Sequence, residues 1–195
     1  MITIVGILGS ATPPGRLSHA IEEALGRAAT RGHRATLVNL GTLNLGWADA
    51  RTLSERGDDA EAVCNQVALA DAVLFASPVY RASFTGVLKN LLDLVPVEAL
   101  LAKPCGIVAM GATQHHYLGV ESHLRDVLAW FGALVSPSNV YLSSSDFLDG
   151  VPTERAAAQL DSLVESLVSL TQAAPNLGGG GLLPLAAAGP RPARP

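Results

Sequence analysis

The sequence predicts an α/β fold, a three-layer sandwich in which a five-stranded parallel sheet carries helices on both faces. Two patterns predict it: short apolar runs alternate with helical patterns along the chain, and the first run is apolar without interruption. The composition agrees, because 49% hydrophobic and 15% charged residues exclude an intrinsically disordered chain. Right-handed crossovers between the strands favour the doubly wound order 2-1-3-4-5.

The first half of the chain supplies three of the expected strands. Residues 2–8 (ITIVGIL) are continuously apolar, as in a strand buried on both faces. Apolar residues at three- and four-residue spacings from Leu17 to Ala28 predict a helix, which Gly32 ends. The further elements expected here are a strand at 35–40, a long loop at 41–57, a helix at 58–69 and a strand at 72–76.

The second half continues the alternation. It is expected to contain a helix at 83–94, a strand at 105–110, a helix at 120–131, a strand at 133–142 and a helix at 153–170. Pro137 interrupts the last strand, and Thr153 suits the N-cap of the last helix. Residues 174–195 contain five of the 19 glycines and five of the 12 prolines. We therefore expect a single domain over 1–173 and a disordered C-terminal tail over 174–195.

Charge and cysteine content exclude several classes of protein. With 13 basic and 17 acidic side chains, the net charge of −4 gives no broad attraction to nucleic acid. No stretch approaches the roughly 20 apolar residues of a membrane span, and the N-terminus has no basic leader, so we expect a cytoplasmic protein. Cys64 and Cys105 are too few for a disulfide framework or a zinc site and are expected to be buried free thiols.

Ligands of doubly wound sheets bind beyond the carboxyl ends of the strands, so the loop after the first strand is a candidate site. Ser10 and Ser18 add hydroxyl donors, and Arg16 adds a positive charge, at the start of the first helix. Together with the helix N-terminus they predict a phosphate-binding site. The alternative is a plain loop in which Ser18 only caps the helix. Neither G-x-x-x-x-G-K-[ST] nor G-x-G-x-x-G occurs, which counts against a P-loop and a dinucleotide-type Rossmann site.

The loop over residues 77–86 follows the third strand. Pro78 ends the strand, and Tyr80 lies at the mouth of the sheet where no apolar periodicity requires it. An aromatic side chain and free backbone N–H groups could border a flat heteroaromatic ring there. The alternative is that Tyr80 packs in a subunit interface, and both could hold at once.

The third loop follows the fourth strand. Gly111 and Ala112 are small enough for a ligand to approach the backbone. The adjacent His115 and His116 fit a polar surface or an interface better than a metal, because no third ligand lies at a suitable spacing, and we predict no metal site. No G-x-S-x-G motif and no carboxylate pair is evident, so we expect a cofactor to carry the reaction.

The run Ser77–Pro96 (SPVYRASFTGVLKNLLDLVP) resembles the isoalloxazine-binding segment of NAD(P)H-dependent FMN reductases, in particular those that partner alkanesulfonate monooxygenases. Gly9 and Ser10, followed by Arg16 and Ser18, are similar to that family's first loop. Gly111-Ala112-Thr113 stands where the family has Gly-Gly-Thr. The resemblance covers roughly residues 1–172, and the middle segment is its most specific part.

The resemblance implies a flavodoxin-like fold, a homodimer or homotetramer, and FMN and NAD(P)H as cofactor and reductant. It implies hydride transfer from the nicotinamide to flavin N5 without a catalytic side chain, and delivery of reduced flavin to a flavin-dependent monooxygenase. The implied cofactor-binding residues are Ser10, Arg16, Leu17, Ser18, Pro78, Val79, Tyr80, Arg81, Ser83, Gly111, Ala112 and Thr113.

Two departures from the family pattern leave alternatives open. Ala112 replaces a glycine, which crowds the site mildly. In the fourth helix, Ser122 beside His123 stands where sulfonate-related members often carry an inserted Tyr within a π-helix, so a π-turn is left open. FMN could be a released substrate, or it could be retained by a reductase of quinones, azo dyes or other acceptors. A further alternative is a flavodoxin-like electron carrier or a non-catalytic flavin-binding module.

Overall fold

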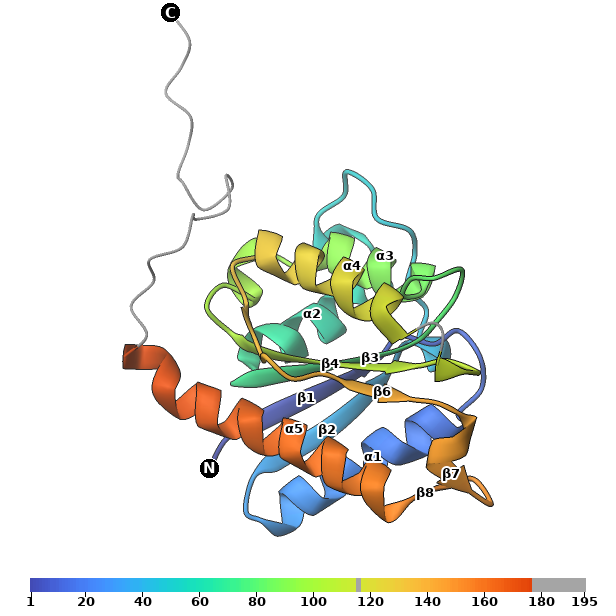
Figure 1. The fold of residues 1–195 in the computed structure, drawn as a ribbon. Helices are drawn as coiled ribbons and strands as arrows, with labels where there is room; N and C mark the ends of the chain where they lie inside the picture. The colour runs from blue at the N-terminus through green and yellow to red at the C-terminus, as the bar shows by residue number, and fades with distance from the viewer. Residues whose placement is uncertain (115–116, 177–195) are drawn as a thin grey trace, which may run out of the picture.

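The computed structural model describes residues 1–114 and 117–176, and its centre is one parallel sheet (Figure 1). The strands lie in the order β2-β1-β3-β4-β5, with β6 also paired to β4. Their bounds are β1 Thr3–Leu8, β2 Arg34–Asn39, β3 Ala72–Pro78, β4 Pro104–Met110, β5 Leu134–Val135 and β6 Val140–Leu142. Every strand pair of this sheet is parallel, so the expected order 2-1-3-4-5 is confirmed.

The expected fifth strand is broken into β5 and β6, as Pro137 predicted. Pro104 of β4 pairs with Leu134, and Val108 of β4 pairs with Val140. The second pair is therefore four residues further along β4 but six residues further along the edge of the sheet. The two additional residues fall in the segment 136–139 between the paired stretches, which contains Pro137, a residue with no N–H to donate to a neighbouring strand. One sheet edge is therefore made of two short strands that continue the same pairing with β4.

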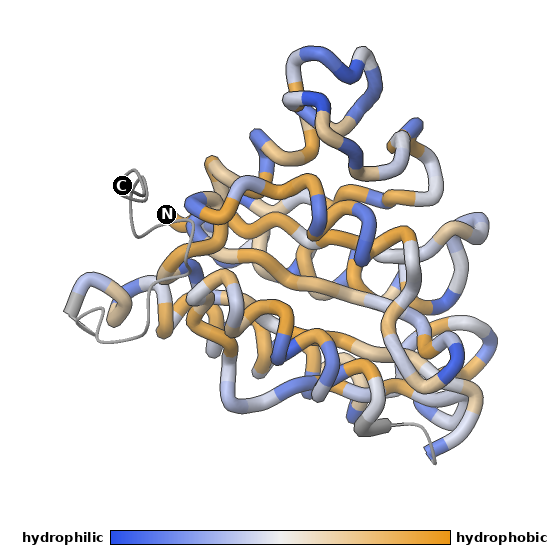
Figure 2. Tube along the Cα trace, turned by 90° about the horizontal axis from the view of Figure 1, so that it is seen from above, coloured by the Kyte–Doolittle hydropathy of each residue, from blue (hydrophilic) through white to orange (hydrophobic). Residues whose placement is uncertain are grey.

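Helices cover both faces of the sheet (Figure 1). Helices α1 (Arg16–Thr30) and α5 (Glu154–Ala173) pack on one face, and α2 (Ala60–Leu69), α3 (Gly86–Leu94) and α4 (Tyr117–Trp130) on the other. Along β3, Val73 and Phe75 face the second group while Leu74 faces the first, because successive strand residues point to opposite sides. Figure 2 shows the hydrophobic segments along the central elements and hydrophilic ones in the outer loops.

Local signals set several helix ends. The side chain of Thr85 accepts from Leu88 N–H at 3.2 Å, so α3 begins at Gly86 rather than at residue 83. Thr153 caps α5 in the same way, as expected. Gly32, with φ +88°, ends α1. Helix α4 is α-helical from Tyr117 to Trp130, so the π-turn that the sequence left open is absent from these residues.

The loop over residues 41–57 is ordered by a buried arginine. The Arg56 side chain has no exposed area and donates to the Trp47 carbonyl at 2.9 Å and to Asp49 at 3.0 Å. Its Nη2 lies 3.1 Å from Asp58, and hydrogen bonds from backbone N–H groups hold the pKa of that carboxyl below its usual value. Asn90 of α3 donates to the Gly46 carbonyl, which attaches the loop to the helical layer.

The second half of the chain contains a hairpin that the sequence analysis missed. Strands β7 (Phe147–Leu148) and β8 (Val151–Pro152) are antiparallel and joined by Asp149-Gly150. Both turn residues have positive φ, the geometry that Asp-Gly favours in two-residue hairpins. The Asp-Gly turn was visible in the sequence, but the strands on either side of it are only two residues long.

The expected C-terminal tail is described only in part. Residues Ala174–Asn176 form a 3₁₀ turn after α5, and the tail predicted beyond them lies outside the described residues. Across the described part of the chain, no helix has the length and apolar content needed to cross a membrane.

Candidate functional site

The three loops that the sequence singled out meet at the carboxyl edge of the sheet. The register pairs Pro78 with Met110, and Val79 N–H donates to the Met110 carbonyl at 2.8 Å. Gly9 N–H donates to the Ala76 carbonyl at 2.7 Å, which attaches the first loop to the end of β3. The strand order thus brings together segments about 70 and 30 residues apart in sequence.

A cavity of about 230 Å³ opens at the N-terminus of α1. Its lining includes Ser10, Thr12, Arg16, Leu17, Ser18 and Pro78. Gly15 is the N-cap, no side chain caps the helix, and its first turn has no acidic residue. The first N–H groups of a helix have no intrahelical partner and lie at the positive end of its dipole. These residues fit the phosphate of FMN, because the donors and the Arg16 charge suit a dianion.

The hydroxyls of this cradle are arranged by local hydrogen bonds. The oxygens of Ser10 and Thr12 lie 2.8 Å apart, and Thr12 N–H also donates to Ser10 Oγ at 3.3 Å. The Ser18 hydroxyl donates to Glu22 at 3.0 Å within the helix, and α1 begins before it, so Ser18 is not the N-cap. Thr12 was missed by the sequence analysis, although its hydroxyl stood two residues after Ser10.

Arg16 is supported by residues from the far end of the sequence. Its guanidinium lies 5.3 Å from the centre of the Phe147 ring, and its Nη2 lies 3.4 Å from Ser144 Oγ. A cation over an aromatic ring is stabilised by the ring quadrupole. Neither Ser144 nor Phe147 was predicted. The run Ser143-Ser144-Ser145 was visible in the sequence, but nothing there indicated proximity to residue 16.

The second loop forms a tight and strained turn. Tyr80 and Ser83 exchange two backbone hydrogen bonds of 2.9 and 3.1 Å. The two central residues, Arg81 and Ala82, have φ values of 51° and 62°, the left-handed region in which non-glycine residues are uncommon. Each such residue costs about 1–2 kcal/mol. The turn leaves the Tyr80 side chain 49% exposed beside the carboxyl edge of the sheet.

Buried polar contacts attach this turn to the sheet. The Thr85 hydroxyl donates to the Gly9 carbonyl at 2.6 Å, and Thr85 N–H donates to Ser77 Oγ at 3.1 Å. Thr85 is 3% exposed and Ser77 is fully buried. One threonine therefore caps α3 and joins the first loop to the second.

The glycines of the first and third loops make room for neighbouring side chains. Gly111 was expected to let a ligand approach the backbone, which stays a prediction, and a Cβ there would collide with the Tyr141 hydroxyl. That hydroxyl donates to the Thr113 carbonyl at 2.6 Å and so fixes the third loop. A Cβ on Gly9 would lie 2.6 Å from the Leu88 Cβ. Both glycines accommodate the protein's own side chains.

The twelve predicted site residues are only partly brought together. Ser10, Arg16, Leu17, Ser18 and Pro78 line the cavity at the N-terminus of α1. A separate surface hollow is lined by Val79, Tyr80 and Arg81. Ser83 lies at the far end of the strained turn. A Cβ added to Gly111 would lie 3.5 Å from Val79 Cγ2 at the edge of the sheet, and Ala112 and Thr113 are exposed beside it.

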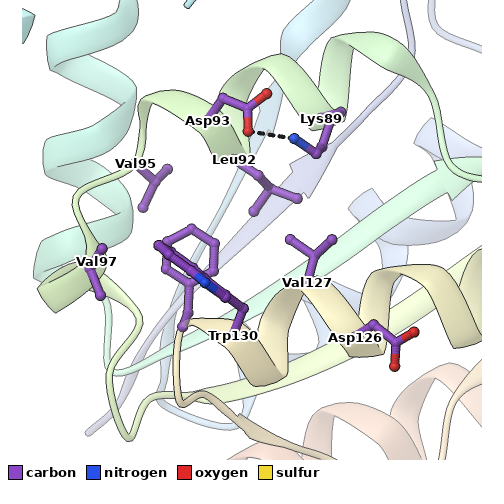
Figure 3. Close-up of a pocket in the computed structure, with 9 residues that line it drawn as sticks. Lys89, Leu92, Asp93, Val95, Val97, Asp126, Val127 and Trp130 are labelled. Carbon is purple, nitrogen blue, oxygen red and sulfur yellow. Dashed lines mark hydrogen bonds and ion pairs between the residues drawn. The ribbon is translucent and has the colours of Figure 1, made fainter. Parts of the chain in front are cut away.

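A larger cavity, of about 530 Å³, lies away from this edge, between α3 and α4 (Figure 3). It is mainly apolar, with Leu92, Val127 and Trp130 in its wall, and Trp130 is 57% exposed. The Lys89–Asp93 ion pair borders it. It has no array of phosphate donors, so we place the candidate flavin site at the carboxyl edge despite the smaller cavity there.

The two cysteines are buried, as predicted. Burial raises the pKa of the Cys64 thiol to about 11 and that of Cys105 to about 12, so both are neutral and unreactive near pH 7. Within residues 1–114 and 117–176, no cluster of three or more His, Cys, Asp or Glu could bind a metal. His115 and His116 lie outside the described residues.

Comparison with known proteins gives concordant matches. Residues 2–147 match the family model described as NADPH-dependent FMN reductase. The chain is 30% identical over 171 residues to the NADH-dependent FMN reductase SfnE of Pseudomonas putida, covering 87% of this chain and 92% of that protein.

Solved structures match the fold. The apo form of an NADH:FMN oxidoreductase (EMOB) has a TM-score of 0.74 at 24% identity and covers 95% of this chain and 96% of its own. An archaeal flavodoxin has a TM-score of 0.61 at 8% identity and covers 88% and 99%. With the observed strand order, these likenesses show that the fold is flavodoxin-like, as expected.

Proposed function

The chain belongs to the NADPH-dependent FMN reductase family, and from this premise we propose that it passes a hydride from NAD(P)H to flavin N5 and delivers reduced FMN to a monooxygenase. As an NAD(P)H-dependent FMN reductase, it uses the flavin itself as the hydride acceptor. The observation that carries the proposal is the cavity at the N-terminus of α1, whose lining includes Pro78, two residues before the strained Tyr80–Ser83 turn.

The first loop is proposed to bind and orient the phosphate. Arg16 supplies the positive charge, the α1 N-terminus supplies backbone donors, and Ser10 and Ser18 add hydroxyls. Because Ser18 Oγ now donates to Glu22, it would have to rotate to reach the phosphate. Leu17 closes the apolar side of the cradle.

The second and third loops are proposed to border the ring. Pro78, Val79, Tyr80, Arg81 and Ser83 form one side, on the tight turn. Gly111, Ala112 and Thr113 form another, next to Val79. Their role is to position the ring and shield it from water, since hydride transfer to N5 requires no side-chain acid.

The proposal is tested by mixing the purified chain with FMN and NADPH, or NADH, and following absorbance at 340 nm. We expect flavin-dependent oxidation with at least one nicotinamide. Absence of oxidation above background with either nicotinamide and with FMN or FAD would refute the reductase activity. Loss of the flavin on gel filtration supports delivery to a partner, whereas a retained flavin supports reduction of quinones, azo dyes or other acceptors.

We also propose a homodimer or homotetramer, with residues 1–173 as the reductase domain. The mainly apolar cavity between α3 and α4, with its exposed Trp130 (Figure 3), supports self-association. Contiguous apolar surface on a monomer commonly marks an interface. Light scattering after size exclusion tests it: a monomeric mass at micromolar concentration would contradict the proposal.

A further inference from the structure

The Tyr80–Ser83 turn receives support from outside its own segment. Two adjacent non-glycine residues, Arg81 and Ala82, are in the left-handed region, and such geometry persists only where surrounding structure fixes it. The backbone bonds between Tyr80 and Ser83 close the turn. Hydrogen bonds of Val79 and Thr85 attach the residues on either side of the turn to the sheet. A second element contacts the turn itself.

Helix α4 is that element. His123 Nδ1 lies 2.9 Å from Ser83 Oγ, a contact between residues 40 apart in sequence. One helical turn earlier, Gly119 lies against the Ala82 carbonyl so closely that a Cβ there would collide with it. Positions 119 and 123 are four residues apart and share one face of the helix. The helix therefore touches both the strained residue and the residue that closes the turn.

The His123 contact is not required by the hydrophobic core. His123 is exposed, whereas its neighbour Leu124 provides the fully buried side chain at this point of α4. A hydrogen bond between exposed side chains contributes little to global stability. The hydrogen bond between His123 and Ser83 can instead select one position of the turn. It can form with either imidazole tautomer, since a serine hydroxyl both donates and accepts.

We infer that His123 is a positioning residue for the flavin ring: through Ser83 it fixes the Tyr80–Ser83 turn in the shape that receives the isoalloxazine. This inference rests on the proposed placement of the ring against that turn. It assigns a functional role to a helix residue outside all three cofactor loops.

The test compares FMN dissociation constants, measured by quenching of flavin fluorescence, for wild type and the variants H123A, S83A and S83A/H123A. We expect each single variant to raise the dissociation constant about three- to tenfold, the size of one lost hydrogen bond. The double variant should bind no more weakly than either single variant, because both remove the same contact. The melting temperature of the flavin-free protein should be unchanged.

Two further variants separate positioning from simple truncation. H123N places a polar atom where Nδ1 lies and should restore most of the affinity, whereas H123L fills space without a hydrogen bond and should not. H19A is the matched control: His19 is an exposed helix histidine that contacts Glu23 instead of the turn, and its loss should leave FMN binding unchanged.

A readout without flavin completes the test. In the flavin-free H123A protein, the backbone amides of Tyr80 and Ser83 should exchange hydrogen faster than in wild type, with other segments unaffected. Unchanged affinity and exchange in H123A would overturn the inference, and so would additive losses in the double variant. Oxidation of NAD(P)H by wild type tests the proposed function separately: an active wild type with an unaffected H123A refutes only the inference, whereas a wild type that binds no FMN refutes both.

Discussion

The two halves of the candidate site are built in different ways. The phosphate cradle is local: Ser10, Thr12, Arg16 and Ser18 lie within nine residues, and the helix that begins at Arg16 supplies the remaining donors. The ring side is assembled from β3, β4, β6 and α4, over segments up to about 60 residues apart. A local anion site can therefore be predicted from a sequence, whereas a ring platform depends on how distant segments pack.

The largest effect is expected from removing Arg16, the one full charge among residues 10–18. Arg16→Ala should raise the FMN dissociation constant about 10- to 100-fold, because a charge-assisted hydrogen bond contributes about 1.5–3 kcal/mol. Riboflavin, which has no phosphate, should bind equally well to variant and wild type. Fluorescence titration with both flavins measures the difference.

Arg31→Ala is the matched control for that titration. Arg31 lies at the other end of α1 and pairs with Asp161 and Glu165. Its loss should change neither titration. Equal weakening of FMN and riboflavin by Arg16→Ala would show that Arg16 supports the fold of the loop and does not bind the phosphate.

The long-range half is tested by overpacking. Gly111→Ala would force a Cβ into the Tyr141 hydroxyl and should destabilise the fold by about 1–3 kcal/mol, measured by urea denaturation. Adding Tyr141→Phe should recover part of the loss, but not all of it, since the ring carbon Cζ would still lie 3.1 Å from the new Cβ.

Gly26→Ala in α1 is the matched substitution for which we expect a gain in stability. No atom lies within 4 Å of an added Cβ there, so the substitution should stabilise the helix by about 0.5–1 kcal/mol. A stable Gly111→Ala protein would mean that Tyr141 moves freely and does not fix the third loop.

Thr85 joins the two halves, so its removal should affect both. Thr85→Ala loses the α3 cap and leaves the Gly9 carbonyl without its 2.6 Å donor, which should cost about 1–2 kcal/mol in urea denaturation. Thr85→Ser keeps the hydroxyl and should retain most of the stability. Equal losses for alanine and serine would assign the effect to the missing methyl group.

The smallest effect is expected at Phe147, which together with Ser144 supports Arg16 from a distant segment of the chain. Phe147→Ala should weaken FMN binding about two- to fivefold, because an exposed cation–π contact contributes about 0.5–1 kcal/mol. Phe147→Tyr keeps the ring and should bind FMN as wild type does. Leu148→Ala, at the exposed neighbouring position, is the control, and an equal effect there would indicate a general loosening of the hairpin.

Much of the framework could be predicted from the sequence because it depends on neighbours in the chain. Gly32, Thr153 and Pro137 each act through their own backbone geometry or a hydrogen bond within a few residues, and the structure confirms all three. The start of α3 was predicted too early. The capping role of Thr85 is also local, but its competition with the helical pattern of residues 83–94 was not recognised.

The sequence by itself determined the alternation of strands and helices and the buried faces of several helices, and it predicted a phosphate-binding loop at the first helix. Only the tertiary structure decided why Gly9 and Gly111 are glycines, what supports Arg16, and which helix touches the Tyr80–Ser83 turn. The physical reason is that periodicity and capping act over a few residues. Contacts such as those of Phe147 with Arg16 and of His123 with Ser83 arise only once the parallel crossovers have placed their strands side by side.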